Sequence, residues 1–218
     1  MARKPRIWYP GAIYHVMSRG NRRGALFKDR DDHISFLEYV QKIRKKHPFK
    51  IHSICLMDNH FHMLLETQND SLSLIMKKIL QLHASEFNNK YHLNGHVFED
   101  RFVSSLIEDE PYFLEVSRYI HLNPVKAQMV LSPQDYIYSS YDLFVPDRTN
   151  QEDPAKQIIK EIVDTDRVME YFGGDQEQYR MFVEGEQSHT EQENQIQKEM
   201  REDEMWLPRI VEGACVVL

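Results

Sequence analysis

Cysteine is scarce in this chain and long apolar runs are missing. Its 218 residues include two cysteines, Cys55 and Cys215, which stand far apart in unlike contexts. This argues against a disulfide framework and a thiolate metal site, so we expect each to be a packed or surface thiol. No apolar run approaches the roughly 20 residues that span a bilayer, and the opening MARKPRIWYPG lacks the apolar core of a secretory signal. We therefore predict a cytoplasmic protein with no membrane contact.

Basic side chains are outnumbered by acidic ones, which gives a net charge of -7, but the two kinds of charge are unevenly distributed along the chain. Through residue 130 there are 19 Lys and Arg against 14 Asp and Glu, a net of +5. This leaves 8 of the 27 basic and 20 of the 34 acidic side chains for the remainder, a net of -12. Ten of the 11 histidines lie in the basic part, and neutral imidazole is a good metal ligand at pH 7. Any contact with nucleic-acid phosphate is therefore predicted there.

Hydrophobic periodicity predicts the order strand, helix, strand, strand, helix, strand, helix. Strands are expected at 12–18, 49–57, 60–66 and 98–107, and helices at 29–46, 71–90 and 110–122. The dipeptide Asp58-Asn59 is typical of a tight hairpin turn. We expect Asn123-Pro124 to end the third helix, because the residue before a proline is pushed out of the helical region. This order suits a mixed sheet covered by helices.

The second part of the chain differs in composition. Helices are predicted at 158–172 and 176–183, separated by Gly173-Gly174, whereas 184–204 is rich in Glu, Gln and Ser and has a composition close to disorder. We therefore divide the chain into a domain at 1–145 and an acidic, mainly helical extension at 146–218 with a partly disordered tail.

The segment His60-Phe61-His62 carries candidate metal ligands. Side chains two apart in a strand share a face, so His60 and His62 can direct their imidazoles at one cation while Phe61 faces the core. Taken alone the pattern is a weak signal, because His-x-His also occurs as a structural pair and in unrelated zinc enzymes.

A second element lies at residues 118–127. Tyr119 and Asn123 are four apart and share a helix face, which lets a phenol oxygen and an amide oxygen converge on one small volume. His121 points away from both. The position of Asn123 at the predicted helix end leaves its direction open.

These segments together resemble the single-tyrosine HUH transposases, in particular the REP-associated tyrosine transposases. The resemblance covers about residues 5 to 145. It is carried by Ser18-Arg19-Gly20-Asn21, Met57-Asp58-Asn59-His60-Phe61-His62, Gly95-His96-Val97-Phe98 with Arg101-Phe102, and Tyr119-Ile-His-Leu-Asn123-Pro124-Val125-Lys126-Ala127.

The resemblance implies an α+β fold with a ferredoxin-like antiparallel sheet and helices packed on it. It also implies a DNA endonuclease and strand transferase in which His60, His62 and Asn123 bind Mg²⁺ or Mn²⁺ and Tyr119 is the nucleophile. The chemistry of the residues agrees: two imidazoles and an amide leave coordination positions open for a phosphate. A phenol with a free pKa of about 10 needs that field or a base to attack, and attack would give a 5′-phosphotyrosine and a free 3′-OH.

Single-stranded or hairpin DNA is the expected substrate, because paired duplex hides the bases and constrains the backbone. Arg19, Arg22, Arg23 and Arg101 are the candidate backbone contacts. Each could equally be a surface charge or an internal ion-pair partner.

Other residues and other functions have to be weighed against this hypothesis. Surface or hydrogen-bonded structural roles are expected for His15, His33, His47, His52, His83, His92 and His96, and packing roles for Tyr112, Tyr136, Tyr138 and Tyr141.

The rival function is a domesticated protein that binds a DNA or RNA hairpin without cutting it. A zinc hydrolase lacks an evident third His or a Glu within the motif. Monomer and homodimer both remain open.

Overall fold

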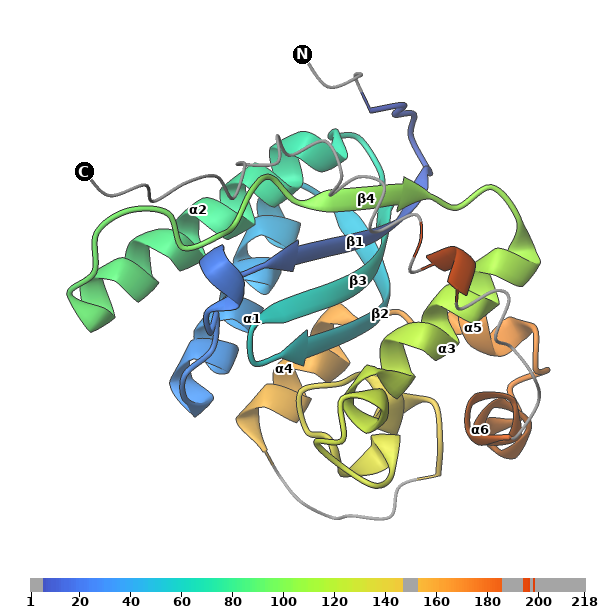
Figure 1. The fold of residues 1–218 in the computed structure, drawn as a ribbon. Coiled ribbons are helices and arrows are strands. Elements are labelled where there is room, and N and C mark those ends of the chain that lie inside the picture. Colours follow the sequence, from blue (N-terminus) through green and yellow to red (C-terminus); the bar gives the residue numbers. More distant parts are fainter. Residues whose placement is uncertain (1–5, 147–152, 186–193, 197, 199–218) are drawn as a thin grey trace, which may run out of the picture.

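A four-stranded antiparallel sheet forms the centre of the molecule. The structure is a computed structural model that describes residues 6–146, 153–185, 194–196 and 198. Its strands are β1 (Ile13–Arg19), β2 (Phe49–Met57), β3 (His60–Thr67) and β4 (Val103–Leu106), in the spatial order β2-β3-β1-β4 (Figure 1). All three pairings are antiparallel. This confirms the predicted ferredoxin-like α+β fold.

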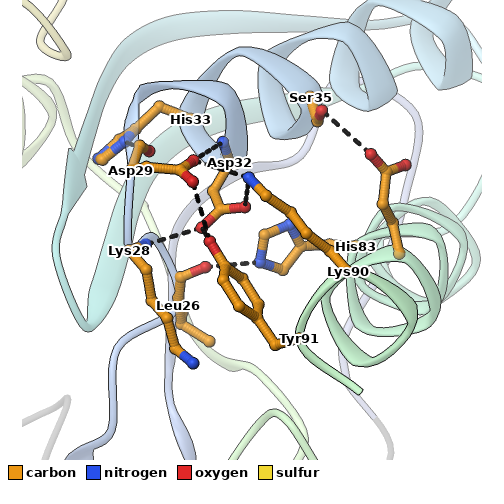
Figure 2. Close-up of polar contacts among 10 residues, drawn as sticks. Leu26, Lys28, Asp29, Asp32, His33, Ser35, His83, Lys90 and Tyr91 are labelled. Carbon is orange, nitrogen blue, oxygen red and sulfur yellow. Dashed lines mark hydrogen bonds and ion pairs between the residues drawn. The ribbon is translucent and has the colours of Figure 1, made fainter. Parts of the chain in front are cut away.

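Two long helices, α1 (Arg30–Lys46) and α2 (Leu72–Tyr91), lie together on one face of the sheet (Figure 1). The alternation of strand side chains explains why: Val16, Phe61 and Met63 point to this face and belong to one buried apolar cluster with the helices. Figure 2 shows a polar cluster where the start of α1 meets the end of α2. Lys90 Nζ lies 2.8 Å from both Asp29 Oδ1 and Asp32 Oδ1, so it joins the two helix ends.

The third helix, α3 (Glu110–Lys126), covers the opposite face of the sheet. The predicted end of this helix at Asn123 was wrong, because the helix continues past Pro124 for two more residues. A proline lacks the N–H that would bond the carbonyl of Ile120, but it stands in the last turn and costs the helix little there. The backbone N–H of Ala127 donates to the Asn123 carbonyl at 2.9 Å and closes the helix.

The extension contributes α4 (Pro154–Ile162), α5 (Asp166–Glu170) and α6 (Gln176–Glu184). The single helix predicted at 158–172 was wrong, since it is two helices separated at 163–165. Backbone of β2 interrupts it: the N–H of Asp164 donates to the Ile51 carbonyl at 2.8 Å, and Val163 bridges to Ile51. An edge strand has unpaired backbone groups that can bind a passing segment in this way.

Two further expectations concern the ends of elements. The fourth strand is shorter than predicted, because only Val103–Leu106 pair along β1, while Phe98 forms an isolated bridge with Gly20. Most of the segment 184–204 and Cys215 lie outside the described residues, whereas Cys55 is a buried free thiol as expected. Among the residues described, no helix combines the length and apolar character that crossing a bilayer requires.

Candidate active site

The two histidines of the His-x-His segment lie on β3, an inner strand of the sheet. His62 pairs with Met17 and His60 with Arg19 across β1, and β2 pairs with β3 on the other side. The two imidazole rings are 5.0 Å apart between centroids and stand nearly perpendicular. Both project from the face that α3 covers, as the period of a strand requires.

Tyr119 of α3 completes this group from a distant part of the same chain. Its ring centroid lies 5.6 Å from that of His62, in an edge arrangement, and the residue is only 9% exposed. The ammonium group of Lys126 lies 5.3 Å from the centroid of the Tyr119 ring. One chain therefore supplies both the histidine pair and the tyrosine.

Asn123 stands one helical turn beyond Tyr119. Its Nδ2 donates to the Tyr119 carbonyl at 2.8 Å, and the side chain is partly exposed. The helix continues through this position, so Asn123 and Tyr119 share a face as the spacing predicted. The amide oxygen is the hard ligand atom that the residue could offer to a cation.

His15 is a member of this group that the sequence did not indicate. It lies on β1, is fully buried, and its Nε2 is 3.0 Å from Nδ1 of His62. Its ring centroid is 5.8 Å from that of Tyr119. The expected hydrogen-bonded structural role is met, but at the centre of the site rather than elsewhere. The register of β1 against β3 decides this contact, and a single sequence does not reveal that register.

Burial keeps these imidazoles neutral. It lowers the pKa of His15 to about 3. For His60, burial and then the charge of Arg19 lower the pKa to about 4, and burial lowers the pKa of His62 well below its usual value. Uncharged imidazoles carry the lone pair that a metal needs at neutral pH, so His60 and His62 fit the role of ligands.

His60 and His62 are the candidate imidazole ligands of a cation at this site. Within the described ranges, no three His, Cys, Asp or Glu side chains are grouped so that they could hold a metal ion. An amide oxygen, water or a phosphate oxygen could act as further ligands beside the two imidazoles.

A known protein family matches the part of the chain that contains these residues. The family model described as "Transposase IS200 like" matches residues 9–123, which is more than half of the chain and includes His15, His60, His62, Tyr119 and Asn123. The chain belongs to the IS200-like transposase family.

Two known proteins are similar to this chain. A protein of Haemophilus influenzae, provisionally described as a REP-associated tyrosine transposase, is 29% identical over 123 residues, which cover 48% of this chain and 69% of that protein. The solved structure of a REP-associated tyrosine transposase bound to a REP hairpin matches with a TM-score of 0.57 at 19% identity, and covers 70% of this chain and 96% of that chain. At that identity the likeness shows the fold.

A basic turn, residues 20–24, lies next to the histidine pair. The N–H of Gly20 donates to the Asn59 carbonyl at 2.8 Å, directly before His60. A Cβ on Gly20 would lie 2.0 Å from the Gly24 carbonyl oxygen, so only glycine fits there. Arg22 and Arg23 are exposed and have φ angles of 53° and 58°, which are uncommon for residues other than glycine.

The other candidate DNA contacts differ in their surroundings. Arg19 forms an ion pair with Glu99, with Nε 2.7 Å from Oε2. The ion-pair role that the sequence left open for Arg19 is therefore present. Arg101 is exposed in the segment before β4. A DNA contact stays a prediction for all four arginines.

Three of the other tyrosines, Tyr136, Tyr138 and Tyr141, have packing roles. The hydroxyl of Tyr136 donates to the Leu56 carbonyl at 2.7 Å, and that of Tyr141 donates to Glu184 at 2.7 Å. Tyr138 stacks on His33 with 3.6 Å between centroids. Several histidines are likewise structural, as expected: His33 contacts the Asp29 carbonyl and His83 the Leu26 carbonyl.

Proposed function

We propose that this transposase is a metal-dependent endonuclease and strand transferase that cleaves single-stranded or hairpin DNA through a 5′-phosphotyrosine at Tyr119. The observation that carries the proposal is the 5.6 Å between the ring centroids of Tyr119 and His62. His62 and Tyr119 are more than fifty positions apart in the sequence, and the fold brings them together on one face of the sheet.

Each residue has a part in the proposed reaction. His60 and His62 hold a divalent cation through their neutral imidazoles, and Asn123 offers its amide oxygen. A bound Mg²⁺ or Mn²⁺ supplies Lewis-acid polarisation of the scissile phosphate and offsets the charge that develops there. The buried Tyr119 lies on α3, and the helix positions its phenol oxygen for attack.

The proposed step balances as a transesterification. The Tyr119 oxygen forms a bond to phosphorus while the bond from phosphorus to the 3′ oxygen breaks, and that oxygen leaves as a 3′-OH after taking a proton. The phenol loses one proton and the leaving oxygen gains one. Because the phosphotyrosine bond conserves the energy of the broken bond, a second 3′-OH can attack it and join strands without ATP.

The substrate class rests on charge and on the structural relative. That relative is a REP-associated tyrosine transposase bound to a REP hairpin, and we infer a hairpin or single strand here too. The exposed Arg22 and Arg23 lie in a turn that is hydrogen-bonded to the residue before His60. Phosphates held by this turn would come close to the proposed metal ligands, since cationic side chains position the backbone.

The test is a search for a covalent adduct. The full chain is incubated with a panel of hairpin and single-stranded oligonucleotides and Mg²⁺ or Mn²⁺, and then run on a denaturing gel. We expect a metal-dependent adduct that Tyr119→Phe abolishes while DNA binding is retained. Hairpin binding by the wild type without an adduct for any DNA of the panel would favour the non-cutting alternative.

A further inference from the structure

We infer that Asn59 is a positioning residue that fixes the proton of His60 on Nδ1 and so leaves Nε2 free to bind a metal. The inference deepens the proposed function and rests on it. Asn59 is the second residue of the hairpin turn between β2 and β3 and directly precedes His60.

The hydrogen bond between the two side chains has only one possible direction. Nδ1 of His60 lies 2.7 Å from Oδ1 of Asn59. An amide oxygen accepts hydrogen bonds and cannot donate them, so the imidazole must be the donor. A neutral imidazole carries a single N–H, and with that proton on Nδ1 the lone pair is on Nε2.

The orientation of the Asn59 amide is fixed independently. Its Nδ2 lies 3.2 Å from the carbonyl oxygen of Arg23. A carbonyl oxygen also only accepts, so the NH₂ end must face Arg23 and the oxygen end must face His60. A flipped amide would place its NH₂ group against Nδ1 of His60, which would then have to accept. It would also place its oxygen against the carbonyl oxygen of Arg23, where no donor would lie between them.

The turn that provides this carbonyl is tied to the hairpin turn by backbone hydrogen bonds. Arg22 and Arg23 adopt left-handed backbone angles, which persist only where surrounding contacts hold them. Bonds from the N–H groups of Gly20 to Asn59 and of Leu26 to Asp58, each 2.8 Å, tie this segment to the hairpin turn. The basic turn and the orientation of His60 are therefore linked through one amide.

The partner of His62 is a second imidazole, that of His15. Nδ1 of His62 is 3.0 Å from Nε2 of His15, and Nε2 of His62 has a lone pair for a ligand only when His62 is the donor of this bond. Either imidazole of that pair could be the donor, so the contact does not fix a tautomer by itself. Asn59 is the residue whose chemistry decides the position of a proton.

The experiment measures proton position and metal binding separately. Long-range ¹H–¹⁵N NMR of the ¹⁵N-labelled full chain distinguishes the two imidazole tautomers, and His60→Gln identifies the His60 signals by their loss. Mn²⁺ binding is followed by the EPR signal of the free ion. The variants are Asn59→Ala, which removes the acceptor, and Asn59→Asp, which keeps an acceptor in the same place.

We expect the metal-free wild type and Asn59→Asp to carry the His60 proton on Nδ1. In Asn59→Ala the Nε2–H form should gain population, and the Kd for Mn²⁺ should rise by roughly 10- to 100-fold, as for loss of other outer-shell partners. A wild-type His60 protonated on Nε2, or an unchanged Mn²⁺ affinity in Asn59→Ala, would overturn the inference. A wild type with the proton on Nδ1 that binds no Mn²⁺ would instead overturn the proposed metal function, so the two failures are distinguishable.

Discussion

His121 and Tyr179 share a buried hydrogen bond of 2.8 Å between Nδ1 and the phenol oxygen. His121 lies two residues after Tyr119 on α3, but on the side of the helix that faces the extension. The same phenol oxygen is 2.9 Å from Ser117 Oγ. Tyr179 of α6 is therefore hydrogen-bonded to the α3 residues that stand two positions before and two positions after Tyr119. The acidic extension is thus part of the support of the helix that carries the proposed nucleophile.

Removing this hydroxyl should weaken that support. In Tyr179→Phe, Ser117 and His121 lose a shared buried partner, and we expect the free energy of unfolding to fall by about 1–3 kcal/mol. Chemical denaturation measures the change, and Tyr9→Phe is the matched control because Tyr9 is 48% exposed. An equal effect in both variants would show that the shared bond contributes nothing particular.

The histidine pair should control metal-dependent chemistry. His62→Gln removes a buried imidazole that we propose as a metal ligand, and we expect the yield of covalent DNA adduct to fall roughly 100-fold or more, with weaker binding of Mn²⁺. His96→Gln is the control, since His96 is an exposed histidine of the same domain. Retained Mn²⁺ affinity and adduct yield in His62→Gln would rule out its role as a ligand.

His83 should make the protein less stable in mild acid. Burial is the main cause that lowers its pKa to about 4, although the Leu26 carbonyl and the charge of Asp32 favour the protonated form. Below pH 6.5 the unfolded chain takes up a proton that the folded chain excludes. The contribution of His83 is therefore fully present above pH 6.5 and is lost as the pH falls towards 4, by about 2 kcal/mol at pH 5.

A variant isolates this contribution from those of the other histidines. His83→Gln keeps a side-chain donor for the Leu26 carbonyl but cannot titrate. We expect the loss of unfolding free energy between pH 7 and pH 5 to be smaller in His83→Gln than in the wild type by about 2 kcal/mol. Identical pH dependence in the two proteins, measured by denaturant unfolding, would contradict this assignment.

The polar cluster of Figure 2 should contribute more to the free energy of unfolding than exposed ion pairs usually do. Asp32 is buried and accepts from Lys90 Nζ at 2.8 Å and from the Tyr91 hydroxyl at 2.7 Å. We expect Asp32→Asn to lower the free energy of unfolding by about 1–3 kcal/mol, because these donors lose a charged acceptor. The neighbouring exposed Asp31→Asn should change it by less than about 0.5 kcal/mol.

Much of the fold could be predicted from the sequence because its elements follow simple periodicity. The alternation around Phe61 identified a strand whose histidines share one face, and the spacing of Tyr119 and Asn123 identified one face of a helix. The extent of α3 past Pro124 could not be predicted, since a proline in the last turn costs too little to end a helix.

Parts of the candidate site could not be predicted because they depend on tertiary contacts. The pairing of β1 with β3 places His15 against His62, and a shift of one residue would have turned His15 to the other face. The side-chain bonds of Asn59 depend on a turn more than thirty residues earlier in the chain. Such contacts between distant segments leave no periodic pattern in a single sequence.

The most direct test of the central claim is to locate the tyrosine that becomes linked to DNA. Covalent adduct formed with a 3′-labelled oligonucleotide, whose label stays on the strand joined through its 5′ phosphate, is digested with nuclease and trypsin, and the peptide that carries the remaining nucleotide is sequenced by mass spectrometry. We predict that the modified peptide contains Tyr119, which stands between Arg118 and Lys126 in a short tryptic fragment. A phosphate on Tyr112, Tyr136, Tyr138 or Tyr141, with Tyr119 unmodified, would contradict the account.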